Sequence, residues 1–368
     1  MPVKKITITE FLLQSITHPV IDVRSPAEFA QAHFPGAHSL PLFTDEERMK
    51  VGIAYKQQSR EHAIKSGLNF FGPKMRTMVD EAEKIVNENI GRGKNTAHNL
   101  LQEGKHQTQH PILVHCWRGG MRSRAVAWLL DLYGFDVYVL EGGYKVYRNW
   151  VLQQFEKDYE LKIVGGYTGS GKTTVIQQLQ KNGERIIDLE ALANHKGSAF
   201  GALGQPQQPR QEMFENLLAK ELYLQSNKDD KAIWIEDESQ RIGVLNIPGP
   251  FWRIMRSKPV YFIDIPFEAR LQYINKEYGS HEKEKLVNAV IRIQKRLGPV
   301  ETKTSIGHLL EDNHIECFRI LLGYYDKQYA KALYNRENIE ALLNKIECFA
   351  VDTISNTEKI KACEVVNI

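Results

Sequence analysis

The chain has 368 residues, of which 42% are hydrophobic and 25% are charged, so it is ordinary globular material long enough for two hydrophobic cores. Its net charge of +3 permits a nucleic-acid partner without requiring one, and its four widely spaced cysteines argue against a disulfide framework or a zinc knuckle. Because no stretch offers about 18 uninterrupted apolar residues, we expect a soluble, cytoplasmic protein with no membrane partner.

Three apolar stretches in the first part of the chain predict short strands, at residues 20–24, 111–114 and 137–140. Residues 125–130 indicate a helix between the second and third strands. This alternation of strands and helices is typical of a parallel sheet covered by helices. Such α/β folds place their active sites beyond the carboxyl ends of the strands.

The first of these strands ends in Asp22 and Arg24. Ser25 is suited to cap a following helix, and Pro26 suits the first helical position. An acid and a base at a strand end commonly form a structural bridge, so we interpret Asp22 and Arg24 as braces of the fold.

A cysteine follows the second strand, in the stretch His115-Cys116-Trp117-Arg118-Gly119-Gly120-Met121-Arg122-Ser123. At a strand-to-helix turn, backbone N–H groups and a helix N-terminus favour an anion. Cys116 is therefore predicted to be a thiolate nucleophile in an oxyanion cradle. The alternative is a buried structural cysteine, which the neighbouring arginines and glycines argue against.

Four motifs now stand in the order that rhodanese domains have them: Asp22-Val23-Arg24-Ser25-Pro26 with Glu28-Phe29, His33-Phe34-Pro35-Gly36-Ala37, the Cys116 loop, and Glu141-Gly142-Gly143-Tyr144. The first part of the chain therefore resembles a rhodanese domain. The resemblance implies transfer of a sulfur or selenium group through a persulfide, or its selenium analogue, on Cys116.

The cysteine loop departs from many rhodaneses in one spacing. Arg122 lies six positions after Cys116, and this Cys-x5-Arg spacing is also the signature of tyrosine phosphatases. Arg118 and Arg122 could seat a tetrahedral phosphorus oxyanion through bidentate hydrogen bonds. A phosphatase therefore stays an alternative to a rhodanese. In either case, the predicted catalytic residues are Cys116, Arg118 and Arg122.

An insertion spans residues 42–110, between the first helix and the cysteine loop. Thr44 can cap a helix there. Residues 55–60 mix an aromatic side chain with cations, which suits either base stacking with phosphate binding or an ordinary solvated helix face. Residues 91–107 are polar and glycine-bearing, as expected of a loop.

A helical stripe over residues 144–158 predicts a helix that connects two domains. We expect a rhodanese-like domain with a helical insertion over residues 1–152. Residues 153–368 then form a P-loop domain of the α/β class with a helical C-terminal part.

The second domain opens with a strand at residues 161–165, and the next eight residues match the pattern GxxxxGK[ST] before a helical stretch. This strand, loop and helix context predicts phosphate binding. Lys172 supplies a point charge, and Thr173 can reach a Mg²⁺ ion. The predicted phosphate-binding residues are Gly166, Gly169, Ser170, Gly171, Lys172, Thr173 and Thr174.

Three further apolar strands, at residues 185–190, 232–238 and 260–264, end in carboxylates. Such acids suit metal or substrate handling at the sheet edge, with Asp188 a candidate and either Glu236 or Asp237 the best Walker-B-like residue. For any single one of them, capping of the next helix is an equally good interpretation.

Farther along, the glycine-rich residues 194–201 and the extended residues 205–209 are suited to cover a substrate. Arg270 is a candidate phosphate ligand, whereas the cations at 292–298 better fit a solvated helix face. Residues 281–345 are predicted to be mainly helical, and residues 348–352 to form a closing strand.

A rhodanese-like domain joined to a P-loop domain, with Asp188-Leu189-Glu190-Ala191-Leu192-Ala193-Asn194-His195-Lys196-Gly197-Ser198-Ala199-Phe200-Gly201 after the P-loop, resembles the tRNA 2-selenouridine synthase family over nearly the whole chain. The resemblance implies a transferase that replaces sulfur by selenium in 2-thiouridine at the tRNA wobble position. Geranyl diphosphate and selenophosphate are the implied co-substrates, and an S-geranylated tRNA is the intermediate. We expect no tightly bound cofactor, although Mg²⁺ fits the P-loop, and a selenophosphate-producing enzyme is a candidate partner.

The residues are consistent with this chemistry, because a diphosphate fits the P-loop without ATP hydrolysis and selenophosphate offers an oxyanion to the Cys116 loop. Three alternatives stay open: a rhodanese-type sulfurtransferase, a Cys-x5-Arg phosphatase, and a regulatory nucleotide-binding module that binds ATP or GTP at Lys172.

Overall fold

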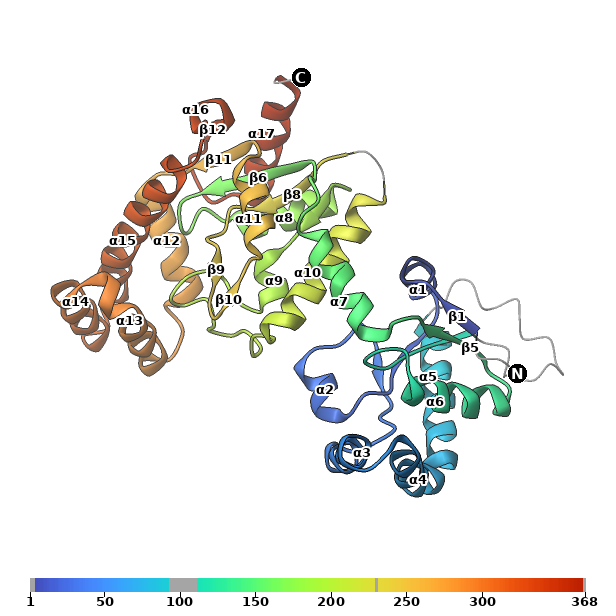
Figure 1. Cartoon of the computed structure of the whole chain (residues 1–368). Coiled ribbons are helices and arrows are strands. Elements are labelled where there is room, and N and C mark those ends of the chain that lie inside the picture. The colour runs from blue at the N-terminus through green and yellow to red at the C-terminus, as the bar shows by residue number, and fades with distance from the viewer. Residues whose placement is uncertain (1–3, 93–110, 229–230, 367–368) are drawn as a thin grey trace. The chain divides into compact units, whose positions relative to one another are not determined.

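The computed structural model describes residues 4–92, 111–228 and 231–366. The chain divides into two compact units, Met1–Gln153 and Gln154–Ile368, and each has its own parallel sheet (Figure 1). Among the described residues, no helix is both long enough and apolar enough to cross a bilayer.

The first unit is an α/β fold whose elements alternate as the apolar pattern predicts. They are β1 (Lys4–Ile6), α1 (Ile8–Gln14), β2 (Val20–Asp22), α2 (Pro26–Gln31), β3 (His38–Ser39), α3 (Asp45–Gln57), α4 (Arg60–Phe71), a 3₁₀ turn (Gly72–Lys74), α5 (Met75–Arg92), β4 (Pro111–His115), α6 (Met121–Tyr133), β5 (Asp136–Leu140) and α7 (Gly143–Gln154). In the described part of this unit, the strands form one parallel sheet in the order β1-β5-β4-β2-β3.

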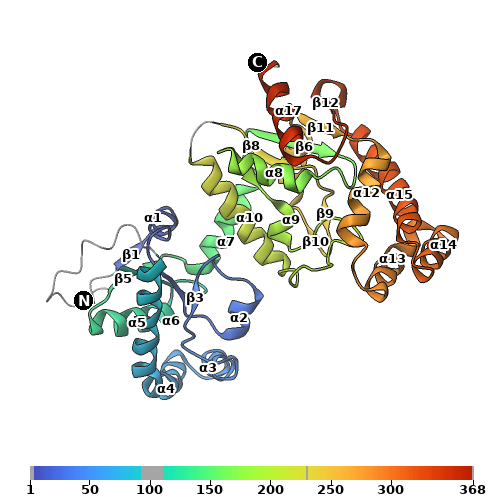
Figure 2. The ribbon, with the colours of Figure 1, turned by 180° about the vertical axis from the view of Figure 1, so that it is seen from behind.

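Strand β4 lies between β2 and β5, and all but its first residue are buried. Helices α5 and α6 lie side by side against the sheet (Figure 2), and they share one apolar core with β2, β4 and β5. The insertion supplies α3, α4 and α5, and Thr44 caps α3 as predicted. Most of the loop predicted at residues 91–107 lies outside the described residues.

The second unit is also α/β, with a helical region toward its C-terminus. Its elements are β6 (Leu161–Gly166), α8 (Lys172–Lys181), β7 (Arg185–Ile187), α9 (Leu189–Ala193), α10 (Gln211–Ser226), β8 (Ile233–Glu236), β9 (Arg241–Ile242), β10 (Leu245–Asn246), α11 (Gly249–Arg256), β11 (Val260–Asp264), α12 (Phe267–Tyr278), α13 (Lys283–Leu297), α14 (Pro299–Leu310), α15 (His314–Tyr334), α16 (Ile339–Leu342), β12 (Leu343–Glu347) and α17 (Thr353–Val366). Over the described residues, the main sheet is parallel in the order β12-β11-β6-β8-β7.

Strand β6, which leads into the P-loop, is the middle strand of this sheet. Helices α13, α14 and α15 pack together beyond α12 and form a second apolar core (Figure 1). The second unit therefore combines a sheet that carries the P-loop with a helical part packed at its side.

Three predicted elements need correction. The strand expected at 185–190 ends at Ile187, because Asp188 caps α9 by accepting the Ala191 N–H at 2.8 Å. The closing strand is β12, not residues 348–352. Its sequence Leu343-Asn344-Lys345-Ile346-Glu347 is polar because it lies at the sheet edge, and it therefore lacks the apolar run that marks a central strand. The helix expected to run to residue 158 ends at Gln154.

Candidate functional site

Cys116 lies directly after the central strand β4, before helix α6 begins at Met121. Its side chain is buried. The backbone at the start of α7 holds the cysteine loop, because the Tyr144 N–H donates to the Cys116 carbonyl at 2.8 Å and the Lys145 N–H donates to the Trp117 carbonyl at 3.0 Å. The loop is therefore fixed by a segment that follows the next strand.

This close approach explains the second glycine of the Glu141-Gly142-Gly143-Tyr144 motif. Gly143 has φ +62°, and a methyl group on it would collide with the Cys116 carbonyl and the Gly119 nitrogen. A side chain at this position would both strain the backbone and push the cysteine loop away.

The Cys116 sulfur has a polar neighbour on α6. Its Sγ lies 3.2 Å from the Ser123 hydroxyl, which is itself buried. A hydroxyl there can donate to a thiolate, and so stabilise it. Sequence reasoning did not select Ser123 as a site residue, although it occupies the last position of the His-Cys-x5-Arg-Ser pattern.

The two arginines of the loop have different surroundings. Arg118 is exposed. Arg122 forms an ion pair with Glu28 on α2, at 2.6 Å, and Arg48 on α3 contacts the same carboxylate at 3.0 Å. Burial alone would raise the pKa of Glu28, but the Arg122 hydrogen bonds and charge, the Ser25 N–H and Arg48 together lower it to about 2. An anion that binds Arg122 must therefore compete with Glu28.

Asp22 and Arg24 brace the fold, as interpreted from the sequence. Both side chains are fully buried and joined at 2.6 Å, and Arg24 also donates to the Ala32 carbonyl. The Arg24 guanidinium lies 3.8 Å from the ring centroid of Tyr144, the residue that anchors the cysteine loop. The pair therefore packs against the residue that anchors the cysteine loop.

The P-loop connects β6 to α8. Gly169 and Gly171 have positive φ angles of 81° and 76°, the backbone form that a phosphate-binding turn needs. Ser170 is buried. The Lys172 Nζ donates to the Gly166 carbonyl at 3.0 Å, and the Thr174 hydroxyl donates to the Gly171 carbonyl at 2.8 Å.

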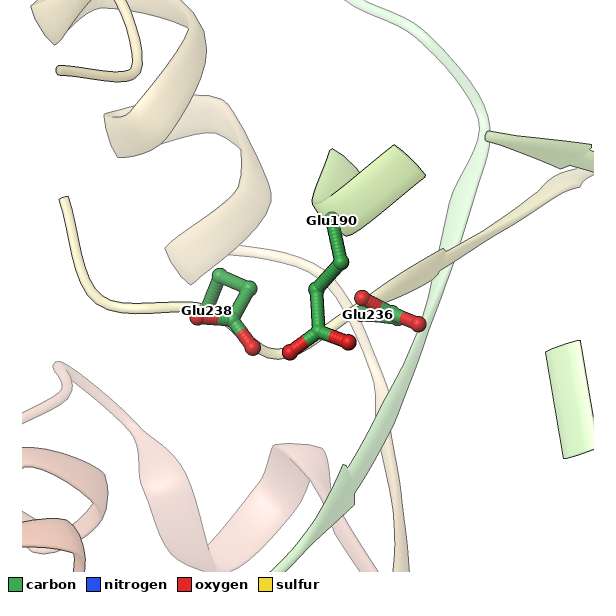
Figure 3. A group of neighbouring side chains, drawn as sticks. All are labelled: Glu190, Glu236 and Glu238. Atoms are coloured by element: carbon green, nitrogen blue, oxygen red, sulfur yellow. The ribbon is translucent and has the colours of Figure 1, made fainter. Parts of the chain in front are cut away.

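Three carboxylates gather beside the P-loop (Figure 3). Glu236 ends β8, Glu238 follows it, and Glu190 lies on α9. One oxygen from each lies within 4.8 Å of the others, and the Thr173 hydroxyl donates to Glu190 at 2.7 Å. Of the residues predicted for the site, Thr173 and Glu236 therefore lie together in the structure. Glu190 and Glu238 join them, although the sequence marked these two only as acids near strand ends.

Glu236 is the most unusual member of this cluster. It is completely buried, and both of its carboxylate oxygens lack a hydrogen-bond partner among the described residues. Burial and the charges of Glu190, Asp188 and Glu238 raise its pKa well above the usual value. Burial and Glu190 likewise raise the pKa of Glu238 to about 8. Such a buried, electron-rich group of oxygens fits a divalent cation.

The other predicted acids and the predicted arginine have structural partners instead. Asp237 pairs with the buried Arg336, and Asp188 caps α9. Arg270 is buried and pairs with Asp326 at 2.7 Å. Of the two Walker-B-like candidates, Glu236 is therefore the one that joins the carboxylate cluster, in which Glu190 accepts the Thr173 hydroxyl.

The glycine-rich segment that follows α9 lies against the carboxylates. At Gly197, with φ +67°, an added methyl carbon would lie 2.9 Å from a Glu238 oxygen and 3.1 Å from a Glu190 oxygen. Lys196 pairs with Glu277. This segment therefore forms one wall of the cluster.

Comparisons with known proteins agree with both units. The profile of the tRNA 2-selenouridine synthase AAA domain matches residues 159–345, and that of the rhodanese-like domain matches residues 9–149. Proteins named tRNA 2-selenouridine synthase are similar along most of the chain. The one from Sulfurovum sp. is 33% identical over 86% of this chain and 88% of its own length. The one from Psychromonas ingrahamii is 34% identical over 87% and 88%, and that from Hydrogenovibrio crunogenus 33% over 84% and 88%.

Proposed function

The chain belongs to the tRNA 2-selenouridine synthase family, and we propose that it converts 2-thiouridine at the tRNA wobble position into 2-selenouridine in two steps. The first step transfers a geranyl group from geranyl diphosphate to the sulfur. The second replaces the geranylated sulfur by selenium from selenophosphate. The observation that carries this division of labour is that each unit has its own anion-receiving loop at a strand-to-helix junction, one with Cys116 and one with Lys172.

In the first step, the 2-thiouridine sulfur attacks C1 of geranyl diphosphate, the C–O bond breaks, and diphosphate leaves with the bonding electrons, while the N3 proton of the base passes to water. The P-loop N–H groups and Lys172 would hold the diphosphate and stabilise its growing charge. The Lys172 ammonium group donates to the Gly166 carbonyl, and its positive charge also acts on the neighbouring carboxyl groups of Glu190, Glu236 and Glu238. It therefore lies between the P-loop and the carboxylate cluster, where it can meet a bound diphosphate.

A divalent cation, with Mg²⁺ the first choice, would be held by Glu190, Glu236, Glu238 and the Thr173 hydroxyl. The buried carboxyl group of Glu236, which has no hydrogen-bond partner among the described residues, supports this assignment. Its pKa is raised by burial and by neighbouring acids, and a bound cation would supply the positive charge that favours its ionised, metal-binding form. When bound, such a cation supplies neutralisation of the diphosphate charge.

In the second step, the Cys116 loop would receive the phosphoryl group of selenophosphate. Attack of the Cys116 thiolate on phosphorus forms an S–P bond as the Se–P bond breaks, and selenide leaves. Selenide then adds to C2 of the geranylated base, the C–S bond breaks, and geranylthiol is released, while water hydrolyses the phosphocysteine. Arg118 and Arg122 would bind the phosphoryl oxygens, so that this sequence needs no oxidant or reductant.

Mass spectrometry of tRNA nucleosides tests both assignments. Cys116→Ser should abolish selenation and let S-geranyl-2-thiouridine accumulate, whereas Lys172→Ala should impair geranylation first. Cys363→Ser, which removes a half-buried cysteine from α17, and Lys181→Ala, which removes an exposed lysine from the end of α8, are the matched controls. The reverse pattern would refute the division of labour.

The same preparation separates the alternatives. Hydrolysis of p-nitrophenyl phosphate through Cys116, without any action on tRNA, would favour a phosphatase, and thiosulfate turnover indifferent to tRNA would favour a simple rhodanese. Tight ATP or GTP binding at Lys172, with no effect of Cys116→Ser, would favour a regulatory module. Omitting tRNA, geranyl diphosphate and selenophosphate in turn shows which of them each step requires.

A further inference from the structure

Helix α15 contacts the phosphate site of the second unit through side chains that lie one turn apart. Asp326 and Tyr329 are three positions apart, so they share one face of the helix. Both connect to the backbone of the P-loop, although α15 lies about 150 residues later in the chain. Neither was selected from the sequence as a site residue.

Asp326 acts on the loop through Arg270. Its two carboxylate oxygens accept hydrogen bonds from the Arg270 guanidinium at 2.9 and 2.7 Å. The same guanidinium donates to the Thr168 carbonyl at 3.0 Å, and its Nε donates to the Ile265 carbonyl at 3.0 Å. Arg270 is buried, so Asp326 both neutralises it and fixes the direction from which it binds the loop.

Tyr329 acts on the loop directly. Its hydroxyl accepts the Gly166 N–H at 3.1 Å and donates to the Asp237 carboxylate at 2.5 Å. Gly166 is buried and is the residue at which β6 ends and the loop begins, with φ +149°. Asp237 is held in turn by the buried Arg336. The hydroxyl therefore completes a half-buried hydrogen-bond network at the first residue of the P-loop.

Lys172 belongs to the same corner of the site. Its Nζ lies 5.7 Å from the ring centroid of Tyr329 and donates to the Gly166 carbonyl. The Tyr329 ring also contacts Tyr167 edge-on, at 5.7 Å between centroids. Tyr329 therefore holds Gly166, and Asp326 holds Thr168 through Arg270. Both contacts precede Gly169–Thr173 in the chain.

We propose that Asp326 and Tyr329 are positioning residues that hold the P-loop in its diphosphate-receiving conformation. This inference rests on the proposed binding of diphosphate by the P-loop. A backbone cradle binds an anion tightly only if its N–H groups already converge on one point, since otherwise part of the binding free energy is used to order the loop. Loss of either anchor should therefore weaken diphosphate binding about tenfold.

The test compares Tyr329→Phe and Asp326→Asn with Tyr324→Phe in the full chain. Tyr324 is on the same helix but packs against the apolar cluster of the helical part, so its variant is the matched control. Calorimetric titration with inorganic diphosphate should give a Kd about tenfold higher for the first two variants and an unchanged Kd for the control. The KM for geranyl diphosphate should rise with the Kd, and kcat should change less.

A second readout separates positioning from a general loss of folding. Selenation of tRNA that is already geranylated depends on Cys116, so it should stay at the wild-type rate in all three variants. Thermal unfolding reports the folded fraction, and the Kd is taken per folded molecule.

Two results would overturn the inference in distinguishable ways. If wild-type protein does not bind diphosphate, the proposed function of the P-loop is wrong. If wild-type protein binds it and both variants bind equally well per folded molecule, the P-loop function stands and the positioning role of Asp326 and Tyr329 is refuted.

Discussion

The cysteine loop of the first unit and the carboxylate cluster of the second both place charged groups at the carboxyl edge of a parallel sheet, but they balance these charges differently. Around Cys116, Arg24 is paired with Asp22 and Arg122 with Glu28. In the carboxylate cluster, three acids lie together, and Glu236 has no hydrogen-bond partner in the described chain. Two of the arginines near Cys116 are therefore already paired with acids, whereas the carboxylates of the second site outnumber the cation beside them, Lys172.

This difference indicates how each site meets its ligand. An anion that binds Arg122 in the cysteine loop competes with Glu28, so binding to that arginine is an exchange of partners. A cation that enters the carboxylate cluster relieves the cost of crowding buried carboxylates. Three substitutions can break or sharpen this comparison.

The largest effect is expected from Gly143→Ala, because the added methyl group collides with backbone atoms of three residues of the cysteine loop, Cys116, Arg118 and Gly119. Selenation should fall on the order of a thousand-fold, equivalent to about 4 kcal/mol, while geranylation continues. Gly52→Ala, at a helical position with open space around it, is the control. Nucleoside mass spectrometry measures both steps, and equal loss of geranylation would show that the damage is not confined to the loop.

The next effect concerns the cation. Mg²⁺ at a hundred times its Kd should stabilise the wild-type second unit by about 2.7 kcal/mol. Glu236→Gln should remove most of that gain. It should also raise the stability of the cation-free protein at neutral pH, because the raised pKa of buried Glu236 costs folding free energy there and a neutral amide does not titrate. Thermal unfolding with and without Mg²⁺ measures both, with Glu358→Gln on the exposed face of α17 as control. A full Mg²⁺ response in Glu236→Gln would mean that the cation binds elsewhere.

The smallest effect is expected from Glu28→Gln. The pKa of Glu28 is lowered to about 2 in the folded protein, below its usual value of 4.5, so ionised Glu28 stabilises the fold. That stabilisation is fully present above pH 4.5 and is lost as the pH falls toward 2. At pH 7 the substitution should lower the free energy of unfolding of the first unit by about 2 kcal/mol.

The difference in free energy of unfolding between the wild type and Glu28→Gln should shrink as the pH is lowered below 4.5. A pH series of unfolding curves measures it. Glu46→Gln, an exposed acid in the first turn of α3, is the comparison. A deficit that is the same at every pH would mean that packing of α2, and not the ion pair with Arg122, explains the loss.

Local sequence patterns predicted much of the fold. The strand and helix on either side of Cys116, and those on either side of Lys172, were placed correctly, because an apolar run followed by glycines and a helical stripe is contiguous in the chain. Edge strand β12 was missed for the converse reason: at the sheet edge it has few buried side chains, so its sequence carries little apolar signal.

The partners within the sites were less predictable. Glu28 lies 94 positions from Arg122, and Tyr329 lies 163 positions from Gly166. From the sequence, Asp237 was as good a Walker-B-like candidate as Glu236, and Asp188 was a further candidate, since all three lie at the ends of apolar strands. Only the folded chain directs Glu236 into the cluster, Asp188 to the N-terminus of α9 and Asp237 to Arg336.

By itself, then, the sequence determined the positions of the cysteine loop and the P-loop, the α/β class of each unit and the family to which the chain belongs. These depend on backbone angles and apolar periodicity within a few tens of residues. The tertiary structure decided which charges are paired and which are left for a ligand, and which helix holds the P-loop. Those contacts join segments that are distant in sequence, and their energies depend on burial and direction, which arise only when the whole unit has packed.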